Sequence, residues 1–305
     1  GGHAGEARGS KRGNCVMVLP SLHERLAEAG LGRLEAEVSG LSETSIGFWL
    51  TALPEEVPKG PRSKLGGNPD LPGRFEWPVS EGRPLDFLLQ LNLSDLRNME
   101  MARLLPRSGV LSFFYDLVAQ PWGYELADGS RFKVVHFPET TTFLERKRPD
   151  GEELRLDERC LDFFPRISVP HLRSQAGDVL ELRSQMSDWE LQKYAKFASE
   201  YERRQGPPLS ETNHHFLGYS ENIQNDMQIQ AQLVTNGVTD GGDMSDPRRA
   251  ELEAGAAEWV LLLQLDSDPS ANLNWGDGGM LYFWIPRQDL RDRKFDRVWA
   301  VLQSH

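Results

Sequence analysis

The chain has 305 residues, of which 39% are hydrophobic and 26% are charged, enough for one large domain or two of ordinary size. Its 34 basic and 46 acidic residues give a net charge of −12, which disfavours nucleic acids and anionic membranes as partners. No apolar run reaches the roughly 18 residues that a membrane span needs. The two cysteines, Cys15 and Cys160, match no metal or redox motif. The favoured interpretation is two free thiols in a reducing cytoplasm, with a single disulfide as the alternative.

The first residues are treated apart from the fold. Residues 1–16 are basic and glycine-rich, and the apolar stretch that follows is too short for a signal peptide. We interpret them as a disordered leader or an expression scar. Residues 17–305 are then expected to form a single domain.

The first predicted element is a helix in "PSLHERLAEAGLGRL", because Ser21 and Glu24 form a capping box ahead of apolar residues at helical spacing. Residues 42–53 alternate like a strand. Residues 54–84 are rich in proline and glycine, which predicts a long folded loop.

Further strands and helices follow. Apolar runs between polar turns predict strands at residues 84–96, 108–117, 132–138 and 166–170. Ser187 and Glu190 form a second capping box and predict a helix over 187–204. Asp246 followed by Pro247 predicts the start of a short helix over 247–255. A polar, glycine-rich loop is expected at 235–246.

A pattern used early in the chain returns later. "EWVLLLQLDSD" (258–268) resembles "LDFLLQLNLSD" (85–95), and this comparison matches Gln90 with Gln264. A polar residue repeated inside an apolar strand indicates a shared structural motif.

The repeat extends on both sides of that strand. "GGMLYFWIPRQDL" resembles "SGVLSFFYDL", which matches Gly109 with Gly279, and residues 64–72 are faintly echoed by 216–224. The order of loop, strand and glycine turn is the same in both halves. We interpret this as an ancient duplication of a β-motif, over about 64–117 and 216–290, because two copies are too few for a solenoid.

Several blocks together resemble the YwqG-like family, a bacterial family of unknown function. They are "KLGGNPDLP", "PLDFLLQLNL", "LGYSENIQNDM", "LLLQLDSD" and "NWGDGGMLYFWI". The resemblance spans about residues 45–302. It implies a mainly β or α+β fold with roll-like antiparallel sheets, an internal duplication and peripheral helices. It implies no activity.

The segment "DSDPSANLNWGD" (266–277) has the spacing of a calcium loop. Its oxygen-bearing side chains include Asp266, Asp268 and Asp277, the three candidate metal ligands. The match is imperfect, because Ala271 stands where the loop needs glycine and Asp277 stands where a longer glutamate is usual. The favoured interpretation is a polar hairpin loop, with calcium as the lesser alternative and no other cofactor expected.

A second group of candidates forms a possible ligand pocket: Gln90, Gln264, Asn274, Trp275 and Asp277. The glutamines are expected to be buried and therefore hydrogen-bonded, as structural clamps more readily than as ligand contacts. Asp277 lies between glycines, which favours a turn, whereas the alternative is a carboxylate at the mouth of a pocket. The segment 274–277 has no counterpart in the first half.

The sequence names no reaction. It contains no P-loop, no dinucleotide-binding fingerprint and no nucleophile elbow. The preferred hypothesis is a non-enzymatic cytoplasmic binding module that engages a protein partner, with toxin neutralisation as a guess. The alternative is a hydrolase or metal-dependent enzyme that uses Asp277, so whether the protein is an enzyme stays open.

Overall fold

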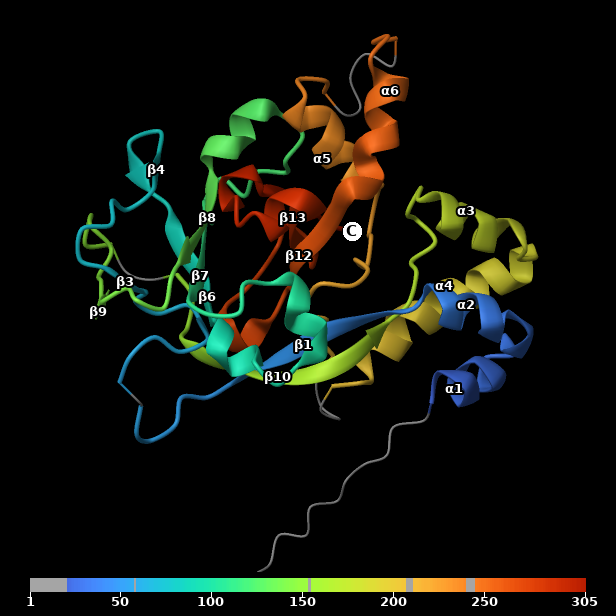
Figure 1. The fold of residues 1–305 in the computed structure, drawn as a ribbon, viewed down its shortest axis with the longest axis horizontal. Helices are drawn as coiled ribbons and strands as arrows, with labels where there is room; N and C mark the ends of the chain where they lie inside the picture. Colours follow the sequence, from blue (N-terminus) through green and yellow to red (C-terminus); the bar gives the residue numbers. More distant parts are fainter. Residues whose placement is uncertain (1–20, 58, 153–154, 207–210, 240–244) are drawn as a thin grey trace, which may run out of the picture.

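A ten-stranded antiparallel sheet forms the body of the protein (Figure 1). The computed structural model describes residues 21–57, 59–152, 155–206, 211–239 and 245–305. Its strand order is β14-β13-β12-β11-β1-β10-β2-β6-β7-β8, and β3–β9 and β4–β5 form two small sheets. The predicted mainly β or α+β fold with antiparallel sheets is confirmed. The predicted leader, residues 1–16, lies outside the described ranges.

The strands of the described residues have the following bounds: β1 (Glu43–Thr51), β2 (Lys64–Leu65), β3 (Asp70–Pro72), β4 (Val79–Ser80), β5 (Arg83–Pro84), β6 (Asp86–Asn92), β7 (Val110–Tyr115), β8 (Phe132–Phe137), β9 (Phe143–Glu145), β10 (Arg159–Ser168), β11 (His215–Phe216), β12 (Trp259–Asp266), β13 (Met280–Pro286) and β14 (Trp299–Gln303). The α-helices are α1 (Leu22–Glu28), α2 (Glu35–Leu41), α3 (Gly177–Ser184), α4 (Asp188–Arg203), α5 (Met227–Thr235), α6 (Arg249–Ala254) and α7 (Arg287–Arg291).

Three α-helix starts have a side-chain cap, those of α1, α4 and α5. The predicted cap at Asp246 is wrong, because α6 begins at Arg249 after an Arg248 N-cap without a side-chain hydrogen bond. Both predicted capping boxes form, at Ser21 for α1 and at Ser187 for α4. Helices α2, α3 and α5 were not predicted. The short helix α3 has no clear amphipathic pattern, whereas α5 is capped by the Asp226 side chain, which accepts a hydrogen bond from the backbone N–H of Ile229.

One strand prediction and one loop prediction need correction. The predicted strand 166–170 is the end of the longer β10, whose Pro165 argues against a central strand when the sequence is read alone. The predicted loop 54–84 carries the short strands β2 to β5. Part of the predicted loop 235–246 lies outside the residues that the structure describes.

The sheet curls into a nearly closed roll. Its two outermost strands come together where the rings of Phe132 (β8) and Trp299 (β14) meet edge to face, with centroids 5.3 Å apart. Further inside, Phe113 of β7 meets Phe283 of β13 at 5.2 Å. The main hydrophobic core therefore lies inside the roll.

The internal duplication is visible in the strand order. Strands β1-β2-β6-β7-β8 repeat as β10-β11-β12-β13-β14, and the two sets exchange their first strands, since β1 pairs with β11 and β10 pairs with β2. Each set carries one bulge at the same place, at Leu88 in β6 and at Leu262 in β12. Gly109 and Gly279 also match, because each precedes the first residue of its strand.

The loop before each repeat aligns one residue away from the sequence comparison. Lys64 pairs with Gln90, and His215 pairs with Gln264, so Lys64 corresponds to His215 and not to Phe216. The sequence comparison aligned Leu65-Gly66 with Leu217-Gly218, but these two dipeptides lie one residue apart in the structural alignment.

Backbone conformation confirms the shifted alignment. The φ angles are 65° at Gly66 and 62° at Leu217, and then 70° at Gly67 and 76° at Gly218. Leucine rarely adopts this left-handed conformation, so its presence shows how strongly the repeated turn is imposed by its surroundings.

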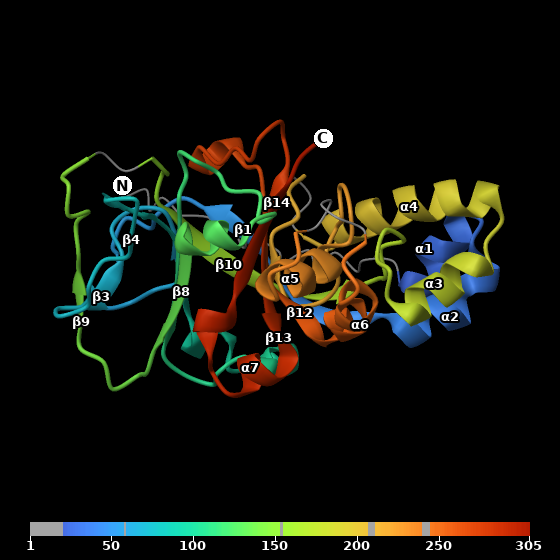
Figure 2. The same ribbon diagram turned by 90° about the horizontal axis from the view of Figure 1, so that it is seen from above.

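Helices α1 to α4 form a lobe at one end of the roll (Figure 2). This lobe has its own hydrophobic core, with Leu26, Leu34, Val38 and Tyr194 fully buried together. Helices α5 and α6 lie between the lobe and the C-terminal strands. The contact region between lobe and roll contains the sites described below.

Two neighbouring glycines give a stability test. Gly278 has a φ of 66° and open space where a Cβ would lie, whereas a Cβ at Gly279 meets the Gln303 carbonyl of β14. We expect Gly278→Ala to lower the free energy of unfolding by about 1–2 kcal/mol through backbone strain. Gly279→Ala should cost more, because β14 must move. Urea denaturation of both variants measures this, and equal losses would contradict the assignment.

Candidate functional site

The predicted metal ligands do not face a common point. Asp268 accepts hydrogen bonds from the Ser270 backbone N–H at 2.8 Å and meets His214 Nε2 at 3.2 Å. Burial alone would raise the pKa of Asp268, but these hydrogen bonds lower it to about 2. Asp266 instead accepts from the backbone N–H of Asn213 at 2.9 Å, and Asp277 is exposed.

No group of three or more histidine, cysteine, aspartate or glutamate side chains suited to a metal ion occurs within the described ranges. Calcium binding by the 266–277 loop stays a prediction.

The segment 274–277 is held by a glutamine from the other half. Gln120 Nε2 donates to the Asn274 carbonyl at 2.9 Å, and its Oε1 accepts from the backbone N–H of Gly276 at 3.1 Å. Trp275 is fully buried and meets Tyr115 edge-on at 5.8 Å. The tryptophan therefore lies in the core, while Asn274 and Asp277 are exposed in the turn.

The first predicted clamp is fully buried and bonds to backbone. Gln90 Oε1 accepts from the backbone N–H of Asp70 at 2.9 Å, and its Nε2 donates to the Arg62 carbonyl at 2.8 Å. Both partners lie in the loop that carries β2.

The second clamp repeats the arrangement. Gln264 Oε1 accepts from the backbone N–H of Glu221 at 2.9 Å, and its Nε2 donates to the Asn213 carbonyl at 2.9 Å. These bonds match the structural interpretation of the repeated glutamine, since each carboxamide pairs with one backbone N–H and one backbone carbonyl of a loop.

A buried charged cluster joins the lobe to the roll. Glu202 of α4 is fully buried, and its Oε2 lies 3.5 Å from Arg166 Nη2 of β10 and 3.5 Å from His171 Nε2. Its Oε1 accepts hydrogen bonds from Ser168 Oγ at 2.8 Å and from the backbone N–H of Val169 at 3.0 Å. Sequence reasoning missed this cluster. Its signal was Glu202 falling on the apolar face of the predicted helix.

The two titratable groups of the cluster shift in opposite directions. Burial alone would raise the pKa of Glu202, but the charge of Arg166 and the contact with His171 hold it far below its usual value. Burial alone would lower the pKa of His171, but its interaction with Glu202 raises that pKa. The pair therefore favours a carboxylate beside a protonated imidazole.

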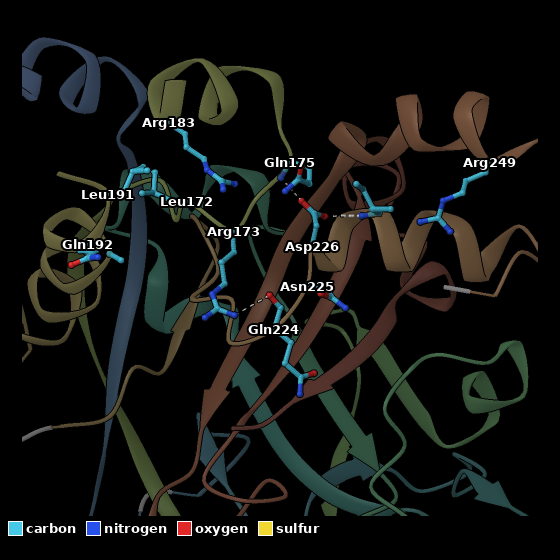
Figure 3. A pocket seen from close by; sticks show the side chains of 12 residues that line it. Leu172, Arg173, Gln175, Arg183, Leu191, Gln192, Gln224, Asn225, Asp226 and Arg249 are labelled. Carbon is cyan, nitrogen blue, oxygen red and sulfur yellow. Dashed lines mark hydrogen bonds between the residues drawn. The ribbon is translucent and has the colours of Figure 1, made fainter. Parts of the chain in front are cut away.

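The larger of two neighbouring cavities has a volume of about 690 Å³ and lies between α3, α4, α5 and α6. We call it the arginine pocket (Figure 3). It is lined by Leu172, Arg173, Gln175, Arg183, Leu191, Gln192, Ala195, Gln224, Asn225, Asp226, Ile229 and Arg249. Figure 3 shows Arg173 and Arg183 on one side of Asp226 and Arg249 on the other.

Positive charge dominates the arginine pocket. Arg173 donates to the Gln224 carbonyl at 3.3 Å, and neither Arg173 nor Arg183 forms an ion pair with a carboxylate of the described residues. Arg249 pairs with Glu253. The single acidic lining residue, Asp226, accepts from the backbone N–H of Gln175 at 2.6 Å and also caps α5.

One wall of this pocket is fixed by the last strand. Gln303 of β14 is fully buried, and its Oε1 accepts from the backbone N–H groups of Ile223 at 2.9 Å and Gln224 at 3.0 Å. Its Nε2 donates to the Asn225 carbonyl at 3.0 Å. This third carboxamide has no counterpart in the first half, where Phe137 occupies the equivalent position.

The second cavity, which we call the histidine cavity, has a volume of about 410 Å³. The segment 171–177 separates it from the arginine pocket, since some residues of this segment line one cavity and some line the other. His171 and Ser174 line the histidine cavity, whereas Arg173 and Gln175 line the arginine pocket. The five predicted pocket residues, Gln90 to Asp277, line neither cavity.

The paired clamps provide a second stability test. Gln264→Ala leaves a buried N–H and a buried carbonyl unpaired, so we expect the free energy of unfolding to fall by about 1–3 kcal/mol. Gln90→Ala should lower the free energy of unfolding by a similar amount, because Gln90 makes two equivalent hydrogen bonds to backbone groups. Urea denaturation measures both losses. If neither variant were less stable than the native protein, the structural role of the two glutamines would be rejected.

The comparisons with known proteins agree with the fold. The family model described as "Domain of unknown function (DUF1963)" matches residues 63–304. No curated protein matches the chain. None of the helices in the described ranges is long and apolar enough to cross a membrane. YwqG-like proteins are members of the matched family, which confirms the resemblance noted in the sequence, and the chain belongs to this family of unknown function.

Proposed function

We propose that the protein binds a small organic anion in the arginine pocket. The observation that carries this proposal is the presence of Arg173 and Arg183 at one cavity without a carboxylate ion-pair partner among the described residues. In a chain with a net charge of −12, such a concentration of positive charge runs against the average surface.

Guanidinium groups favour carboxylate or phosphate ligands. Arginine presents several N–H donors in a planar fork that matches both anions. Arg173 is already oriented by its bond to the Gln224 carbonyl, so part of the entropy cost of ordering it is met before a ligand arrives. Arg183 extends from α3 without such a bond and is free to close on the ligand.

The rest of the lining favours a ligand with an apolar body. Leu172, Leu191 and Ile229 supply an apolar surface, and the neighbouring carboxamides of Gln192 and Gln224 can fix its orientation. The volume of about 690 Å³ lies within the range of cavities that bind small molecules.

This proposal is a specific form of the binding role expected from the sequence. A protein partner, toxin neutralisation, a cytoplasmic location and an enzyme that uses Asp277 all stay predictions.

Arg183→Glu tests the proposal. We expect titration calorimetry with phenyl phosphate and with benzoate to show binding to the native protein at one site. The charge reversal should weaken binding by at least about tenfold, because attraction becomes repulsion. Since the Arg183 side chain makes no hydrogen bond or ion pair within the described ranges, the variant should have the same urea midpoint of unfolding as the native protein.

The matched control is Arg74→Glu, the same change at an exposed arginine in the β3–β4 loop. It should bind both probes like the native protein. Equal binding by the Arg183→Glu variant, or equal weakening in the Arg74→Glu control, would reject the arginine pocket as the site. Binding of neither probe to the native protein would reject the ligand class.

A further inference from the structure

The histidine cavity has a different chemistry from the arginine pocket. Its floor holds His171, Ser174 and Ser220, each less than a tenth exposed. Its rim holds two exposed carboxylates, Glu43 and Asp178. The cavity is therefore lined by buried polar groups, which we call its floor, and by exposed charged groups, which we call its rim.

The floor is built to meet an anion. His171 Nε2 lies 3.5 Å from Glu202 Oε2, a charge contact without hydrogen-bond geometry, and Nδ1 has no hydrogen-bond partner among the described residues either. Burial alone would lower the pKa of His171, but the carboxylate beside Nε2 raises it, which favours the protonated imidazole, the form in which Nδ1 is a donor. A carboxylate in the cavity would accept that proton as a charge-assisted hydrogen bond.

The rim is built to meet a cation. Glu43 and Asp178 bring two negative charges, and Arg287 brings one positive charge to the same rim. Within the described ranges none of the three takes part in an ion pair of 4 Å or less, so one negative charge remains in excess. A ligand with a single ammonium group balances it.

An apolar wall connects floor and rim. Trp259 of β12 and Trp284 of β13 line it together with Leu261, and both tryptophans are less than 5% exposed. Methylene groups lying along this wall would leave water, which contributes about 0.8 kcal/mol for each buried CH₂.

We propose that the histidine cavity is a second binding site, which takes an elongated zwitterion with a carboxylate at one end, an ammonium group at the other and an apolar chain between them. The carboxylate meets His171, the chain lies along Trp259 and Trp284, and the ammonium group lies between Glu43 and Asp178. Nothing in this arrangement requires the arginine pocket to be occupied.

Calorimetry with matched probes tests the site. The probes are three ω-amino acids of increasing length, 4-aminobutanoate, 6-aminohexanoate and 8-aminooctanoate. Hexanoate and hexylamine, which each lack one of the two charges, serve as controls. At least one zwitterion should bind about tenfold more tightly than either singly charged probe. Hexanoate or hexylamine binding as tightly as the best zwitterion, or no binding by any zwitterion, would overturn the proposal.

Two substitutions of His171 separate its structural and binding roles. His171→Gln keeps an amide near the position of Nε2 beside Glu202 but removes the Nδ1 donor, so zwitterion binding should fall at least about tenfold. His171→Asn keeps a neutral donor near the position of Nδ1 and loses the contact with Glu202, so binding should fall less than in the His171→Gln variant while stability falls. Native-like binding by the His171→Gln variant would contradict the assignment.

The exposed rim gives a test that does not disturb the core. In the double variant Glu43→Gln and Asp178→Asn, the preference for aminohexanoate over hexanoate should disappear. The control Glu139→Gln, at an exposed site in the first half, should keep the preference. A preference that survives the double variant overturns the proposal. Loss of zwitterion binding in the Arg183→Glu variant also overturns it, because that result places the probe in the arginine pocket.

Discussion

The antiparallel pairing of β1 with β10 is the constraint on which the rest of the structure depends. Its register runs without a break from Glu43 opposite Ser168 to Thr51 opposite Cys160. Each of these strands then adds its other edge to the opposite repeat, so neither repeat can form its complete sheet alone. This exchange ties the two halves into one body and brings β8 and β14 close enough to nearly close the roll.

The same pair of strands also fixes the lobe. Strand β10 carries Arg166, which lies 3.5 Å from Glu202 of α4, and the chain leaves β10 directly into the segment that begins at His171. Burying such charges is costly unless they are paired and hydrogen-bonded, and here several groups share the carboxylate. The cluster therefore sets the position of the wall between the two cavities, which makes it a structural feature with direct consequences for binding.

The two repeats keep the same backbone but differ in chemistry. Both have a buried glutamine that clamps a loop, and both place a basic residue opposite it, Lys64 in the first half and His215 in the second. Lys64 is buried near Glu158, with Nζ 3.3 Å from its carboxylate, and it lines neither of the two cavities described above. The inserted helices of the second half line most of the arginine pocket, whereas the histidine cavity is lined mainly by strands and loops.

The sequence by itself determined the fold class, the duplication and the glutamine clamps, because alternation, capping boxes and the repeated polar residue are local signals. The sequence also singled out Trp275, which is buried in the core, and Asp277, which is exposed in the turn. Only the tertiary structure brought Arg173 beside Arg183, and His171 beside Glu202. All four residues follow β10 in the chain, and they meet only when α3 and α4 have packed against each other and against the roll, so no spacing along the chain encodes these contacts.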